Sequence, residues 1–181
     1  MICLLLLAGA LAGAPMAATL SPAPAVLQAG LAGKWVGALG YRDYQSDKLF
    51  ELAVKTEILA LPDTVTVLRI SAFDDGPKVG QVYITSASLY DSTGGTVTTA
   101  SLRKGRPVEN ETDRVSTQRF TDAAHWTVIY ERAGEDGDKA AQIRTTETRD
   151  GDVVIAVKEV MPAGTVTWRF RNQTRLAKAA N

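Results

Sequence analysis

The segment Gly40-Tyr41-Arg42-Asp43-Tyr44 holds the densest group of chemically capable side chains in this 181-residue sequence. Two phenols, a guanidinium and a carboxylate at the end of a predicted strand could bind a polar ligand. They could equally form a local Arg–Asp pair flanked by two amphipathic aromatic residues that complete a hairpin. The residues alone favour the hairpin, and the first interpretation makes Tyr41, Arg42, Asp43 and Tyr44 candidate ligand-binding residues.

His125 is the only histidine of the chain. Its neighbours Trp126, Val128 and Tyr130 alternate along an apolar strand face, so His125 is predicted to point the other way. An outward histidine can neither activate a serine inside the fold nor bind a haem there. The sequence therefore predicts no cofactor and favours a protein that is not an enzyme.

Two Asp-x-Asp pairs, Asp136 with Asp138 and Asp150 with Asp152, raise the question of calcium. A calcium site needs six to eight oxygen ligands from a longer loop, whereas both pairs enclose a glycine that is typical of tight hairpin turns. The only cysteine is Cys3, so the rest of the chain has no thiol for a disulfide or a metal. We expect no metal site.

The first 18 residues read MICLLLLAGALAGAPMAA, a short apolar run followed by small residues. This pattern is typical of a secretory signal peptide, although no basic residue precedes the run. Cleavage is expected near Ala17 or Ala18, or as late as Ala25, and the alternatives are a membrane anchor or a disordered tail. Export would make the protein periplasmic or secreted. After the signal peptide we expect an Ala/Pro-rich segment at 19–32, one β-barrel domain at 33–176 and a tail at 177–181.

The charge balance excludes two classes of partner. Twenty Lys and Arg residues stand against twenty Asp and Glu residues, and no half of the chain is strongly basic. Nucleic-acid binding needs a basic surface, and an anionic membrane surface needs a polybasic stretch. We therefore expect no nucleic-acid partner and no binding to an anionic membrane surface. The mature chain is also expected to have no integral membrane span, and its oligomeric state stays open.

From Gly33 onward, apolar residues recur with the period of two that is typical of half-buried strands. The clearest case runs from Phe50 to Ile58, where apolar side chains alternate with mostly charged ones. Strands are predicted near 35–41, 50–58, 64–73, 79–86, 96–103, 115–120, 126–130, 139–149, 153–157 and 165–173. Asp-Gly, Gly-Gly and Pro-containing turns separate them, while residues 104–114 form the longest predicted irregular piece.

The only helix-like stretch is a turn near 25–31. Nine or ten consecutive antiparallel strands are expected to close on themselves, because open sheet edges invite aggregation. The predicted fold is all-β: a single antiparallel up-and-down β-barrel of about 8–10 strands.

The two ends of the chain resemble the lipocalin-like, or calycin, superfamily. Gly33-Lys34-Trp35 matches the G-x-W that opens the first strand in that superfamily, and Trp168-Arg169-Phe170-Arg171 matches its arginine-bearing last strand. The resemblance implies that Trp35 closes the barrel base and that Arg169, Arg171 or Arg175 lies across its ring.

The chain departs from true lipocalins in three ways. It lacks their second motif, shows no C-terminal helix and cannot form their disulfide. It is more similar to the ten-stranded nitrobindin or fatty-acid-binding type. The alternative is that Trp35 is a core tryptophan of another β fold; under the resemblance, Trp35, Arg169 and Arg171 join the candidate ligand-binding residues.

The strands predicted near 96–103, 115–120 and 139–149 carry few large apolar side chains. If they line a closed barrel rather than lie at a sheet edge, its interior includes a partly polar cavity. We therefore expect an exported barrel that binds a small, partly apolar ligand. The alternatives are an enzyme that uses a tyrosine or aspartate at the barrel mouth and a ligand-free interaction module of the cell envelope.

Overall fold

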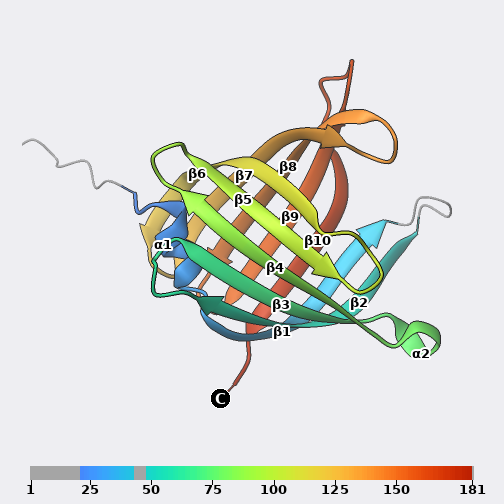
Figure 1. The fold of residues 1–181 in the computed structure, drawn as a ribbon, viewed down its shortest axis with the longest axis horizontal. Helices are drawn as coiled ribbons and strands as arrows, with labels where there is room; N and C mark the ends of the chain where they lie inside the picture. Colours follow the sequence, from blue (N-terminus) through green and yellow to red (C-terminus); the bar gives the residue numbers. More distant parts are fainter. Residues whose placement is uncertain (1–20, 43–47, 181) are drawn as a thin grey trace, which may run out of the picture.

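The computed structural model describes residues 21–42 and 48–180, and there it shows a closed barrel of ten antiparallel strands. Each strand pairs with its neighbour in sequence, and β1 closes the barrel against β10 (Figure 1). The predicted all-β, up-and-down barrel is confirmed at the upper end of the expected strand number. The predicted signal peptide and the candidate residues Asp43 and Tyr44 lie outside the described residues.

The barrel strands are long enough to cross the whole wall, with a short helix before them and a single helical turn among them. Their bounds are α1 Pro24–Ala29, β1 Gly33–Arg42, β2 Leu49–Ala60, β3 Thr66–Asp74, α2 Gly76–Val79, β4 Gln81–Asp91, β5 Thr96–Arg103, β6 Glu109–Asp122, β7 His125–Glu135, β8 Ala140–Asp150, β9 Val153–Pro162 and β10 Arg169–Lys178. No helix within the described residues is long and apolar enough to cross a membrane.

The predicted irregular piece at 104–114 is wrong in its second half, because β6 begins at Glu109. The first residues of β6 are polar or charged, a composition that predicts a loop. In the fold they form a regular ladder with β5, from the pair Ser101–Glu109 to the pair Thr96–Arg114. Backbone pairing across the closed sheet therefore overrides weak local strand propensity in this segment.

The main hydrophobic core fills one end of the barrel, where α1 lies inside the ring of strands (Figure 1). Strand residues whose side chains point inward at this end are nearly inaccessible; they include Trp35, Ile58, Val97, Trp126 and Val128. We call this end the plugged end. We call the opposite end, where the β3–β4 and β5–β6 connections lie, the mouth.

Helix α1 has only six residues, too few for stability as an isolated helix in water. Its Ala25, Leu27 and Gln28 are buried inside the plugged end, and Leu31 just after it is fully buried. The helical turn predicted at 25–31 is thus present, and contacts with the barrel interior stabilise it.

Close approach of β1 and β10 depends on Gly37. A Cβ atom at this position would overlap the backbone oxygen of Arg175 on the neighbouring strand. The absence of a side chain lets the two terminal strands pair from Trp35 to Tyr41 and close the barrel.

Candidate functional site

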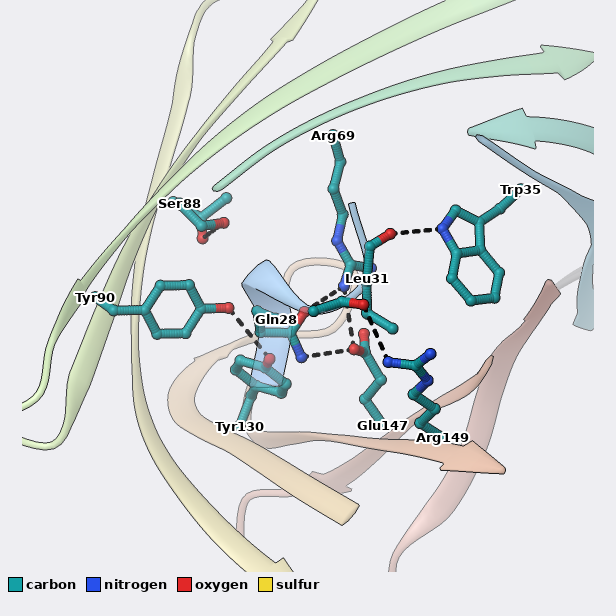
Figure 2. Close-up of polar contacts among 11 residues, drawn as sticks. Gln28, Leu31, Trp35, Arg69, Ser88, Tyr90, Tyr130, Glu147 and Arg149 are labelled. Carbon is teal, nitrogen blue, oxygen red and sulfur yellow. Dashed lines mark hydrogen bonds and ion pairs between the residues drawn. The ribbon is translucent and has the colours of Figure 1, made fainter. Parts of the chain in front are cut away.

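A buried polar network fixes α1 to the barrel wall (Figure 2). The Nε2 atom of Gln28 donates a hydrogen bond to Oε1 of Glu147 at 2.7 Å. Arg69 donates from Nη2 to Oε1 of Gln28 at 2.5 Å and to the same Glu147 oxygen at 3.1 Å. Gln28 is fully buried and the Glu147 side chain is 5% exposed. The network therefore satisfies polar groups that would otherwise be costly to bury.

The ion pair keeps the Arg69 side chain charged inside the barrel. Burial alone would lower the pKa of Arg69, but the adjacent carboxylate of Glu147 raises that pKa above its usual range. With 26% of its surface exposed, the Arg69 side chain also reaches space inside the lumen. A charged arginine held by a carboxylate is suited to anchoring, not to proton transfer at neutral pH.

Two further side chains hold the residues that follow α1. The indole Nε1 of Trp35 donates to the backbone oxygen of Leu31 at 2.7 Å. Arg149 donates from Nη1 to the backbone oxygens of Gly30 and Ala123, both at 3.0 Å (Figure 2 shows its side chain beneath the network). The bonds to Leu31 and Gly30 satisfy backbone carbonyls just after the helix, and the bond to Ala123 links the same Arg149 guanidinium to the β6–β7 turn, so the plug is anchored at several points.

Tyr90 and Tyr130 face each other inside the barrel, with their hydroxyl oxygens 3.3 Å apart. Burial raises the pKa of Tyr90 to about 12 and raises the pKa of Tyr130 well above its ordinary value. Both phenols are therefore neutral at physiological pH. They can donate and accept hydrogen bonds, but neither is prepared to act as a general base.

The inner wall from β5 to β9 carries many polar side chains above the core, alongside the buried Ile143 and Val160. Strand register and alternation place several polar side chains on the inner face, namely Thr99, Ser101, Asp113, Arg132, Thr145, Glu147 and Lys158. Arg132 donates to Asp113 at 3.0 Å and also bonds Glu111. The strands predicted to be poor in large apolar residues thus do contribute polar groups to the barrel interior.

The inner wall from β1 to β4 is apolar near the mouth, where it forms a pocket of about 180 Å³. Its lining residues are Leu39, Tyr41, Leu52, Phe73, Asp75, Val82, Ile84 and Arg103. The ring of Tyr41 stacks on Phe50, with centroids 6.0 Å apart and planes inclined by 25°. We call this the mouth pocket; its apolar lining with a few polar groups is the composition typical of small-molecule sites.

The structure does not bring the predicted ligand-binding residues together. Tyr41 lines the mouth pocket, whereas Trp35 lies on the same strand at the plugged end and is 1% exposed. Arg42 ends β1 with its side chain exposed. Trp35 thus acts as a core residue that closes the barrel, and Tyr41 is the described member of the aromatic cluster that faces the pocket.

The three candidate arginines of the last strand lie away from the Trp35 ring. Arg175 is exposed on the outer surface, Arg169 is exposed at the mouth end of β10, and Arg171 forms an ion pair with Asp136. A cation does lie over an indole elsewhere: the Arg144 guanidinium is 4.2 Å from the ring centroid of Trp168. The expected interaction therefore occurs on the outer wall, with a different pair of residues.

The sequence did not single out the residues of the polar network, although a signal for some of them was present. Alternation places Arg69 on the same face as buried Val67, and Glu147 on the same face as buried Ile143. Charged residues in register with buried aliphatic ones indicate an interior ion pair. No comparable signal marks Gln28, because its environment is created by the insertion of α1 into the barrel.

Comparisons with known proteins bear on the fold. No protein-family model matches the chain, and no curated protein does. Among solved structures, the crystal structure of Rv2717c from M. tuberculosis is similar, with a TM-score of 0.58 and 15% identity. The match covers 88% of this chain and all of that one. At this identity the likeness concerns the barrel fold alone.

Proposed function

We propose that the protein is a calycin-like barrel that binds a small, partly apolar molecule through its mouth. The observation that carries this proposal is the contrast between a plugged end filled by core side chains and a mouth that holds an apolar pocket. Apolar cavities of about 150 Å³ admit a benzene molecule. A pocket of about 180 Å³ can therefore hold one aromatic ring or a short alkyl group of a ligand whose remainder lies in the open mouth.

Three observations support the finer parts of the proposal. Trp35 at the plugged end and the ten-stranded closed sheet fit a calycin-like assignment, as does the likeness in fold to Rv2717c. The apolar leader at 1–18 supports export to the periplasm or outside the cell. Neutral buried tyrosines and ion-paired carboxylates favour binding over catalysis.

Binding of the neutral fluorophore N-phenyl-1-naphthylamine tests the proposal. Ile84 lines the mouth pocket, while Ile70 on the outer face of β3 is a matched control. We expect Ile84→Thr to weaken the affinity about tenfold, because an apolar contact in a pocket contributes about 1–3 kcal/mol. Ile70→Thr should leave the affinity unchanged, and circular dichroism checks that both variants fold.

Two results would contradict the proposal. If the fluorophore does not bind the wild-type protein saturably, the proposal is contradicted, and the alternative of a ligand-free interaction module is favoured. Loss of affinity in Ile70→Thr with full affinity in Ile84→Thr would place the fluorophore on the outer face, where Tyr83, Leu89 and Leu102 are also exposed.

A further inference from the structure

Lys158 is a lysine on the inner face of the barrel. In β9 the side chains of Val154 and Val160 are buried inside the barrel, and Lys158 shares their face by alternation. It is paired in register with Thr145 on β8 and with Asn172 on β10. The lysine side chain is therefore flanked by inward-facing polar residues on both sides.

Lys158 lacks a partner among the residues that the structure describes. No ion pair or side-chain hydrogen bond involves it, whereas the inward carboxylates Glu147 and Asp113 are already bound. Glu147, diagonal to it on β8, accepts hydrogen bonds from Gln28 and Arg69, and Asp113 is bound by Arg132. Since no fully buried side-chain nitrogen or oxygen of residues 21–42 and 48–180 lacks a partner, the Lys158 ammonium reaches solvent within the lumen or at its mouth.

The register connects Lys158 to the mouth pocket. Asn172 pairs with Lys158 on one side and with Tyr41 on the other, so Tyr41 lies two strands away. At about 4.8 Å per strand this separation is about 10 Å between backbones, and Asn172 is the inward residue between the two. A molecule whose apolar part occupies the mouth pocket can therefore reach the ammonium with a polar end.

We propose that Lys158 is the anion-binding residue of the lumen and that the ligand is an aromatic carboxylate, an inference that rests on the proposed function. The positive charge, uncompensated by the described residues, selects the carboxylate, with Asn172 and Thr145 able to complete its hydrogen bonds. The mouth pocket is lined by Tyr41 and Phe73, and Phe50 stacks on Tyr41. These rings favour a ligand whose apolar part is aromatic.

Arg103 is a second cation that belongs in the test. It lines the mouth pocket with its side chain exposed, and Asp75 also contributes to that lining. An exposed rim cation chiefly speeds the approach of an anion, and salt screens its effect. Lys158, further along the inner wall, provides the lasting contact.

The test compares 2-naphthoate with 2-naphthamide, which has a similar shape and no charge, through displacement of N-phenyl-1-naphthylamine. We expect the wild-type protein to prefer the carboxylate at least tenfold, because hydrogen bonds to charged groups are the stronger ones. Lys158→Gln should abolish the preference and leave the affinity for 2-naphthamide unchanged. Lys55→Gln, at an exposed position on the outer face of β2, is the matched control and should keep the preference.

A second measurement needs no variant. Acetylation of the wild-type protein with acetic anhydride, mapped by mass spectrometry, should show Lys158 protected by 2-naphthoate but not by 2-naphthamide, with Lys55 modified equally in both cases.

The outcomes separate the two proposals. If the neutral fluorophore binds but the wild-type protein shows no preference for the carboxylate, the anionic ligand class is wrong and the proposed function stands. If Arg103→Gln abolishes the preference and Lys158→Gln keeps it, the anion site lies at the rim and the assignment to Lys158 is overturned. If the fluorophore does not bind at all, both proposals fail.

Discussion

The two ends of the barrel are built from the same ten strands but differ in how their interior is filled. At the plugged end, α1 and two tryptophans occupy the space, and the polar atoms of the helix are bound by Arg69, Glu147 and Arg149. At the mouth, half of the inner wall is apolar and opens into a pocket. Rigidity at one end and free inner surface at the other are the arrangement expected of a binding scaffold.

The largest expected effect is on the free energy of unfolding when Trp35 or Tyr41 is replaced. These residues lie on the same face of β1, at opposite ends of the strand. Trp35→Ala should lower the free energy of unfolding by about 3–5 kcal/mol, because it removes a fully buried ring and leaves a cavity. Tyr41→Ala should lower it by only about 1 kcal/mol, since its ring is half-buried and stacks on one neighbour. Urea unfolding followed by circular dichroism measures both, and equal losses would contradict the distinction between the two ends.

The next effect concerns the ion pair that anchors the plug. Glu147→Gln should destabilise the fold by about 2–3 kcal/mol, because it leaves the guanidinium of Arg69 without its carboxylate; partial exposure of Arg69 moderates the loss. Glu111→Gln at the Arg132 ion pair is the matched control, and its 47% exposure predicts a loss below about 1 kcal/mol. A larger loss for Glu111→Gln than for Glu147→Gln would show that the anchor contributes little.

The smallest effect is a dependence of stability on alkaline pH. The pKa of Tyr90 is raised from about 10 when unfolded to about 12 in the fold, so the folded protein holds the proton more tightly. The stabilisation is complete below pH 10 and is lost as the pH rises towards 12. By pH 11, Tyr90 should account for about 1–2 kcal/mol of the loss.

Unfolding free energies of the wild-type protein and Tyr90→Phe between pH 9 and pH 11 measure this effect. The variant should show a shallower decline, although Tyr130 still contributes to it. Tyr83→Phe, which alters an exposed ring, should follow the wild-type curve. Parallel curves for the wild type and Tyr90→Phe would show that this phenol is not protected from solvent.

The sequence predicted the barrel more completely than the candidate site. Alternation from Phe50 to Ile58 identified the strand correctly, with Val54, Thr56 and Ile58 inside. Asp-Gly turns predicted the hairpins, and the position of His125 opposite the apolar face of β7 agrees with its exposed side chain. The segment at 109–114 was missed because polar residues with inward and outward positions do not show an apolar period.

The candidate site could be predicted only in part. Tyr41 was selected and does line the mouth pocket, but Trp35 was placed in the same set although it lies at the other end of the strand. Sequence proximity and the alternation of side chains along a strand cannot show which residues of different strands lie at the same height along the barrel axis. In a closed barrel the height of a residue along the axis depends on the stagger between neighbouring strands, summed around the whole circumference.

By itself, the sequence determined the period of two, the positions of the turns and therefore the number and direction of the strands, because these depend on neighbouring residues. Only the tertiary structure decided which end is filled, through the insertion of α1 and the meeting of Gln28 with Arg69 and Glu147. It also decided that Lys158 lies beside Asn172 and Thr145 without a carboxylate partner among the described residues. These contacts join residues far apart in the chain. Closure of the barrel brings those residues to the same height along its axis.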